Sequence, residues 1–313
     1  MQSRSIVPIA FAAVCCLALI GCHKGTSFGP VDEGDGLSAL FEDRLANATQ
    51  HFSMNATTGG TIHGAGGVEF IFPPNAFQTQ GGGIVAGSVN VEVIEVLDIA
   101  DMILLNITTV GDDNGTRRVL NSGGSVYVSA RQGNTELFLG PQGMGIIVPA
   151  TTVSMQMGVF TANRTPGEDL LWTEADNATI TPIAVDTAGS GGGYSYQLQV
   201  DSMQWINCDY FPFSPDNTTI TAITPSDVPN DSTRVWFVFP TLNAVAGGSP
   251  NAPQTYAFGQ VPVGLPAIAV SLTRNGDDYR SAFTNFTTTP TGSVGLSYQP
   301  TTLQAFEAAV NAL

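Results

Sequence analysis

Apolar and polar residues alternate in short runs along most of this chain. Val89, Val91 and Val93 are separated by polar residues, and residues 194–200 keep the same period of two. This alternation predicts strands with one buried face. Similar runs, bounded by glycine, proline and asparagine, recur from about residue 60 to residue 298. Many short strands at regular spacing predict an all-β protein built from β-sandwiches.

Helical spacing occurs only near the two ends of this β-rich region. Leu37, Phe41 and Leu45 lie four residues apart, which predicts a short helix. The apolar spacing after Thr301 predicts a short C-terminal helix with Thr301 as its N-cap.

The first residues have the layout of a secretory signal. An almost wholly apolar run, residues 6–20, follows Arg4 and precedes Gly21 and Cys22. A positive start, an apolar stretch and a small residue before the cut are typical of such signals. The run is shorter than the roughly 20 residues that a membrane-spanning helix needs. The sequence therefore predicts export rather than a transmembrane helix.

The stretch Leu19-Ile20-Gly21-Cys22 resembles the lipobox of bacterial lipoproteins. The resemblance implies diacylglycerol on the Cys22 thiol, cleavage before Cys22, and acylation of the new amine by a fatty acid such as palmitate. Each buried CH₂ contributes about 0.8 kcal/mol, so several acyl chains anchor a protein firmly in a membrane. His23 stands where an aspartate would imply retention in the inner membrane. The same resemblance therefore implies the outer membrane.

These patterns predict two β-sandwich domains with a small β insert between them and a short C-terminal helix. The expected segments are a lipoprotein signal peptide (1–21), the lipidated cysteine and a flexible tether (22–57), a first β-sandwich (58–160), a β-hairpin or junction segment (161–213), and a second β-sandwich with the C-terminal helix (214–313).

The charge balance narrows the range of partners. The chain has 26 acidic and 10 basic residues, a formal charge of −16. Cleavage before Cys22 removes Arg4 and no acid, which takes the charge from −16 to −17. No basic patch is available to neutralise phosphates, so we expect no nucleic-acid partner. Cys208 is the one cysteine left after lipidation, which leaves no intramolecular disulfide.

Residues 58–150 resemble the β-sandwich domain found in ankyrins, zona occludens proteins and netrin receptors. The matching stretches are Gly66–Phe77, Gly87–Val93 and Leu120–Gly124, which combine paired glycines, apolar strands and prolines. The resemblance implies a binding or scaffolding domain and supplies no catalytic residues.

The segment from Trp205 to Phe211 is the densest group of aromatic and polar side chains. Trp205 and Tyr210 could stack on a sugar, while Asn207 and Asp209 could hydrogen-bond its hydroxyls. The alternative interpretation is a wedge between domains, with buried rings and with the two polar side chains bonded to backbone. We therefore treat Trp205, Asn207, Asp209 and Tyr210 as candidate ligand-binding residues with both interpretations open.

Metal and catalytic signals are sparse. Glu95, Asp98 and Asp101 leave the end of a predicted strand close together and are candidates for a Ca²⁺ site. The three histidines, at positions 23, 51 and 63, form no zinc-binding pair. Acids are too numerous for a pair of glycosidase carboxylates to be recognised from the sequence. No catalytic residue is therefore predicted, and no cofactor apart from the Ca²⁺ that these three acids leave open.

The sequence favours a non-catalytic binding or scaffolding protein, held at the bacterial cell envelope by lipid on Cys22. Its expected partner is an envelope protein or a polysaccharide. A carbohydrate-binding surface lipoprotein is the first alternative, and an enzyme acting on envelope polymers is the second.

Overall fold

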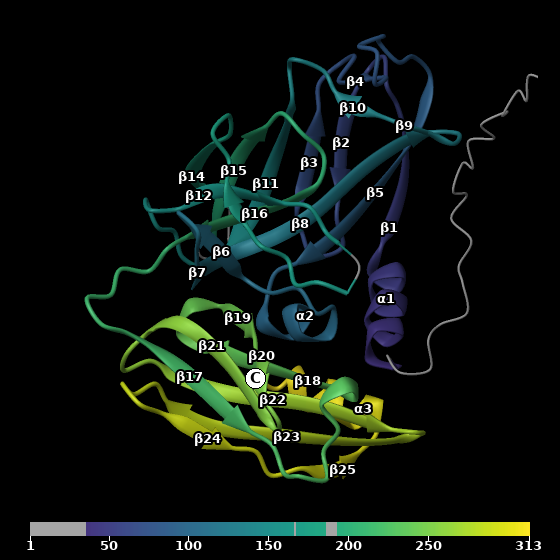
Figure 1. The fold of residues 1–313 in the computed structure, drawn as a ribbon. Helices are drawn as coiled ribbons and strands as arrows, with labels where there is room; N and C mark the ends of the chain where they lie inside the picture. Colours follow the sequence, from purple (N-terminus) through teal and green to yellow (C-terminus); the bar gives the residue numbers. More distant parts are fainter. Residues whose placement is uncertain (1–35, 166, 186–192) are drawn as a thin grey trace, which may run out of the picture. The chain divides into compact units, whose positions relative to one another are not determined.

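The computed structural model describes residues 36–165, 167–185 and 193–313 (Figure 1). The expected signal peptide, the lipobox and Cys22 lie outside the described residues. Strands make up most of the described chain, so the prediction of an all-β fold with a short C-terminal helix is confirmed. No helix within the described ranges is long and apolar enough to span a membrane.

Two sheets form the first sandwich. The strands of sheet A, in spatial order, are β1 (Gln50–Asn55), β5 (Ser88–Val96), β8 (Asn121–Gln132), β16 (Trp205–Tyr210), β12 (Gly158–Ala162) and β13 (Thr173–Glu174), with β9 (Thr135–Glu136) paired to β8. Those of sheet B are β14 (Thr179–Val185), β15 (Gly193–Val200), β11 (Met144–Ala150), β3 (Glu69–Phe72) and β2 (Gly60–His63). Two short pairs accompany them: β4 (Phe77–Gln78) with β10 (Phe138–Leu139), and β6 (Val110–Asp113) with β7 (Thr116–Val119).

The alternation in the sequence places one face of each sheet in a shared core. Val89, Val91 and Val93 of β5 are at most 1% exposed and face Phe70 and Ile146 of the opposite sheet within one apolar cluster. Burial of these faces is the main favourable contribution to the folding free energy of the sandwich.

The segment 161–213, expected as an insert or junction, contributes strands to both sheets of the first sandwich. β15 pairs along its length with β11, and β16 pairs with β8. The first sandwich therefore extends to Tyr210 rather than ending near residue 160. The pairing of β16 with β8 joins residues about 80 positions apart, and the spacing of turns along the chain carries no signal of such a long-range pair.

Part of the expected tether is also folded. Helix α1 (Gly36–Ala48) buries Leu37, Phe41 and Leu45, so the predicted helix is present. β1 follows it and pairs with β5. Of the range 22–57, residues 36–57 therefore belong to the folded body.

The second sandwich is formed by the C-terminal third of the chain. One sheet has the order β20 (Ser249–Ala252), β21 (Thr255–Pro262), β17 (Asn217–Ile223) and β24 (Ser293–Gly295). The other has the order β19 (Ala244–Gly247), β18 (Thr233–Phe239), β22 (Pro266–Asn275), β23 (Asp278–Thr287) and β25 (Gln299–Thr301). Helix α3 (Leu303–Val310) follows, and its N-cap is Thr302, one residue after the predicted Thr301.

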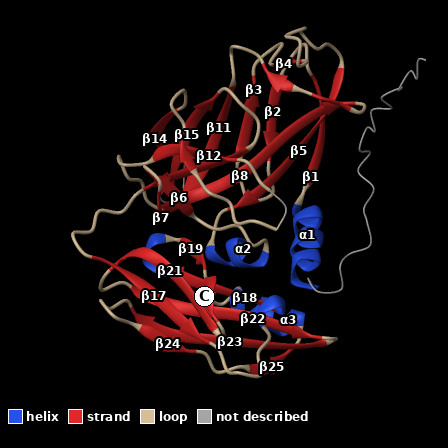
Figure 2. Ribbon diagram, in the orientation of Figure 1, coloured by secondary structure: helices blue, strands red, loops and turns tan. Residues whose placement is uncertain are grey.

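A further apolar cluster joins the two sandwiches through α1, α3 and the short helix α2 (Ile99–Leu104). Figure 2 shows α2 in blue between the two groups of strands. The ring of Trp236 on β18 meets Phe41 of α1 edge-on at 5.7 Å and stacks with Phe306 of α3 at 6.3 Å. The sandwiches thus share a core.

Candidate functional site

Strand β16 carries the four candidate ligand-binding residues, and the structure separates them. Trp205 faces the cluster between the sandwiches, while Ile206 and Cys208 face the core of the first sandwich. Asn207 and Asp209 are both 0% exposed, next to a bulge where β16 pairs with β8. Tyr210 is half-buried and lines a separate cleft at the end of the strand.

The two polar side chains of β16 bond to the protein itself. Asn207 Nδ2 donates to Asp209 Oδ2 at 2.5 Å, and Asn207 Oδ1 accepts from the backbone N–H of Cys208 at 2.9 Å. Burial raises the pKa of Asp209 well above its usual value, although hydrogen bonds from Ser122, Gly123 and Asn207 oppose the shift. The geometry of Asn207 and Asp209 therefore fits the interpretation in which they are buried and bonded within the protein.

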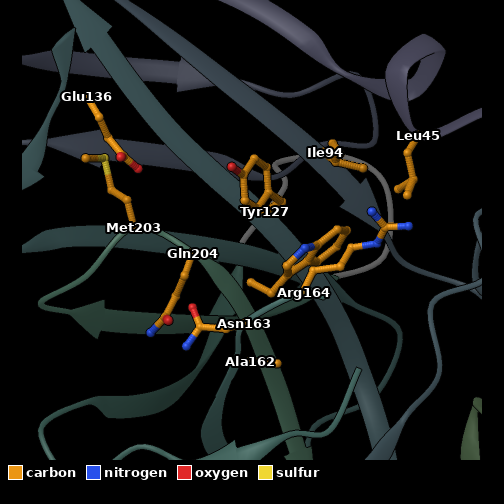
Figure 3. Close-up of a pocket in the computed structure, with 10 residues that line it drawn as sticks. Leu45, Ile94, Tyr127, Glu136, Ala162, Asn163, Arg164, Met203 and Gln204 are labelled. Atoms are coloured by element: carbon orange, nitrogen blue, oxygen red, sulfur yellow. The ribbon is translucent and has the colours of Figure 1, made fainter. Parts of the chain in front are cut away.

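Trp205 lines a pocket of about 380 Å³ between α1 and the outer face of sheet A, shown in Figure 3. We call it the α1 pocket. Its lining residues are Leu45, Ile94, Tyr127, Glu136, Ala162, Asn163, Arg164, Met203, Gln204 and Trp205. The volume falls in the range of about 300–1,000 Å³ that is typical of small-molecule sites.

The floor of the α1 pocket is a row of side chains across four neighbouring strands. Ile94 of β5 is opposite Tyr127 of β8, Tyr127 is opposite Trp205 of β16, and Trp205 is opposite Ala162 of β12. Directly paired residues point to the same face of a sheet, so the row is fixed by strand register. The Tyr127 and Trp205 rings lie 5.4 Å apart at 43°, and Tyr127 is the more exposed of the two.

The rim of the α1 pocket is polar. Arg164 forms an ion pair with Glu42 of α1, through two hydrogen bonds, so its charge is balanced before any ligand enters. Glu136 and the amide side chains of Asn163 and Gln204, labelled in Figure 3, also line the pocket. The pocket therefore combines an apolar, aromatic floor with amide groups and a single unpaired carboxylate.

The three candidate metal ligands are occupied by other contacts. Glu95 accepts hydrogen bonds from Gln50 Nε2 and from the backbone N–H groups of Gly66 and Val68, at 2.8–2.9 Å. Asp98 caps α2 by accepting from the N–H of Asp101 at 2.9 Å. Among the described residues no group of three or more acid, histidine or cysteine side chains is placed to hold a metal ion.

Asp101 completes this cap. Its carboxylate accepts from the backbone N–H of Leu97, the residue before the N-cap Asp98, at 3.2 Å. Burial raises the pKa of Asp101, and the charges of Asp98 and Glu95 add to the shift. Both acids thus stabilise the start of a helix.

Two glycines of the loop that contains the Gly66-Gly67 motif, Gly64 and Gly66, lie against the Glu95 carboxylate. A Cβ at Gly64 would overlap the Glu95 carboxylate, and one at Gly66 would lie 3.0 Å from its Oε1 atom. Gly67 has a φ of +94°, which glycine adopts readily. The motif that carries the family resemblance therefore forms a loop wrapped around a carboxylate.

Sequence reasoning found Trp205 but missed Tyr127, Asn163, Arg164 and Gln204. The alternation predicts the strand that contains Tyr127. It does not predict the residue opposite Tyr127 in the next strand, because that depends on the register of the pairing. Asn163, Arg164 and Gln204 lie in connections, where no periodic signal exists. Another tryptophan, Trp172, is 0% exposed and donates its indole N–H to the Thr108 carbonyl, so it is a core residue.

No known family model matches this chain, and no curated protein matches it in sequence. The resemblances of the lipobox and of residues 58–150 therefore stay predictions from the residues themselves.

Proposed function

We propose that this protein is a lipid-anchored component of the bacterial cell envelope that acts as a non-catalytic binding or scaffolding module. The anchor is the predicted lipid on Cys22, and the outer membrane is the proposed location. Cys22 lies 14 residues before the start of α1 at Gly36. An extended chain spans at most about 3.5 Å per residue, so lipid on Cys22 would hold the folded body within about 50 Å of the bilayer.

The observation that carries the proposal of a binding function is the α1 pocket. The half-buried Tyr127 ring offers apolar contact area, and the amides of the rim offer both donors and acceptors. Glu136 is the one carboxylate in the lining, whereas a typical glycosidase places two acids across one cleft. The lining supports recognition better than it supports hydrolysis.

Photo-crosslinking in living cells tests this proposal. A photoreactive amino acid replaces Asn163 on the rim of the pocket, and a matched variant carries it at Ile84, which is 73% exposed and lies outside the pocket. We expect a discrete crosslinked product from position 163 that is absent from position 84. Equal labelling at both positions, or none at 163, would contradict a binding role for the pocket.

Carbohydrate binding is the second candidate function, and the half-buried Tyr127 ring favours it, since Trp205 beneath it is only 4% exposed. Aromatic faces beside amide groups suit a sugar, whose C–H face is apolar and whose hydroxyls both donate and accept hydrogen bonds. Titration with a glycan panel, with Tyr127→Ala as the test variant and Tyr194→Ala as the control, decides between a sugar and another ligand. Tyr194 is 42% exposed and lies on sheet B, outside the pocket.

A further inference from the structure

A second cavity lies where the two sandwiches meet, and we call it the junction cleft. It has a volume of about 620 Å³. The first sandwich contributes the end of β11 with the loop after it, the start of β8, and Tyr210. The second sandwich contributes the 3₁₀ turn at Pro240–Leu242 and the following Asn243.

Hydrogen bonds hold both walls of the junction cleft in place. Asn243 Nδ2 donates to the carbonyls of Leu97 at 3.1 Å and Ser122 at 3.3 Å, which ties the second sandwich to the first. The Tyr196 hydroxyl accepts from the backbone N–H of Ser154 at 2.6 Å and fixes the loop after β11. The cleft is therefore preformed, which lowers the entropy lost when a ligand binds.

The lining of the junction cleft carries no charged side chain, although the chain as a whole has 26 acidic and 10 basic residues. A charged ligand would lose hydration in such a cleft and find no counter-charge there. The strongly negative body would also repel an anion. The lining therefore selects an uncharged ligand.

The polar groups of the junction cleft are hydroxyls and amides. Thr151, Thr152, Thr241 and Asn121 line it, and their side chains make no hydrogen bond with other described residues. A hydroxyl can donate and accept at once, which matches the hydroxyls of a sugar. The half-buried ring of Tyr210 supplies an apolar surface against which a sugar ring can pack.

Two prolines disfavour an extended peptide as the occupant. Pro149 in β11 and Pro240 in the 3₁₀ turn both line the cleft. Proline has no backbone N–H, so these positions cannot donate to an added strand. A peptide would lose the main-chain hydrogen bonds that give strand addition its affinity.

We propose that the junction cleft binds a short stretch of an uncharged glycan, packed on Tyr210 and hydrogen-bonded by Thr241 and Asn121. This inference extends the proposed binding function to a second site and names its ligand class. Binding there depends on neutral contacts, so its affinity changes little with salt concentration.

Calorimetric titration of the full-length protein in detergent micelles tests the inference. The probes are maltohexaose, cellohexaose, chitohexaose and mannohexaose, with an oligogalacturonate of the same length as the charged comparison. We expect at least one neutral probe to bind, with an affinity that is unchanged on raising NaCl. Absence of heat with every neutral probe up to about 10 mM, where even a millimolar Kd gives a signal, would overturn the inference.

Variants then locate the site. Tyr210→Ala is expected to weaken binding by about tenfold or more, and Thr241→Val, which keeps the shape of an exposed side chain, by about threefold or more. Thr181→Val, an exposed threonine in β14, is the matched control and should bind like the wild type. Wild-type affinity in both cleft variants would overturn the inference.

One further variant separates this inference from the proposed function of the α1 pocket. If Tyr127→Ala abolishes binding while Tyr210→Ala and Thr241→Val retain it, the glycan occupies the α1 pocket. The inference about the junction cleft then fails, and the proposed binding function stands. Loss in Tyr210→Ala and Thr241→Val with full binding in Tyr127→Ala supports the junction cleft.

Discussion

Single carboxylates in this protein hold local structure through several hydrogen bonds at once, and the half-buried Glu95 is the clearest case. Its carboxylate accepts three hydrogen bonds from one side chain and two backbone N–H groups. Hydrogen bonds to a charged group are worth about 1.5–3 kcal/mol each, more than those between neutral groups. Glu95 therefore stabilises the loop that contains the Gly66-Gly67 motif.

Replacing Glu95 with glutamine should lower the free energy of unfolding by about 2 kcal/mol, because an amide NH₂ would face N–H donors in place of one oxygen. Chemical denaturation measures the change. Glu92→Gln is the control, since that side chain is 40% exposed and its ion pair with His51 contributes little. Equal stability of Glu95→Gln and the wild type would contradict the role given to this carboxylate.

Asp209 makes stability depend on pH. Its folded-state pKa is raised above the unfolded value by burial, so the stability present below the unfolded pKa is lost as pH rises toward the folded pKa. Asp209→Asn removes this loss. We expect the variant to have a higher Tm than the wild type at pH 8 and a similar Tm at pH 3, by thermal melts followed by circular dichroism. A lower Tm at pH 8 would contradict the raised pKa of Asp209.

At the scale of elements, the sequence predicts more of the fold than of the sites. Period-two alternation identifies β5 and β15, and the spacing of Leu37, Phe41 and Leu45 identifies α1, because each pattern is local. The pairing of β16 with β8 is non-local, so residues 161–213 look like an insert in the sequence although they complete both sheets. The floor of the α1 pocket depends on that pairing, so the sequence alone does not predict it either.

The assignment of α1 to the folded body has a direct test. Phe41 is 5% exposed and packs edge-on against Trp236. Phe41→Ala should lower the free energy of unfolding by about 3–5 kcal/mol, the usual loss for a buried phenylalanine. Asp43→Ala, at an exposed position of the same helix, should change it by less than about 0.5 kcal/mol. An unchanged free energy of unfolding in Phe41→Ala would instead indicate that residues 36–48 behave as a flexible tether.

At the scale of the whole molecule, the apolar cluster between the sandwiches joins them into one cooperative body. Arg234 and Trp236 of the second sandwich both donate to Asn106 Oδ1 at 3.0 Å, and Arg234 also pairs with Asp169. These contacts couple the stabilities of the two sandwiches. The Asn243 hydrogen bonds to Leu97 and Ser122 add to this coupling at the junction cleft.

We therefore expect the two sandwiches to unfold together, in a single calorimetric transition. Trp236→Ala, which opens the shared cluster, should lower that transition or split it into two. The wild-type protein unfolding in two separate steps would contradict the shared core.

The central proposal is a lipid anchor at Cys22 that presents this body at the envelope. The most direct measurement is the mass of the N-terminal peptide of the protein purified from the membrane fraction of its native cells. We expect a peptide that begins at Cys22 and carries diacylglycerol and an amide-linked acyl chain. A peptide with an unmodified Cys22 thiol, from protein recovered in the detergent-free soluble fraction, would contradict it.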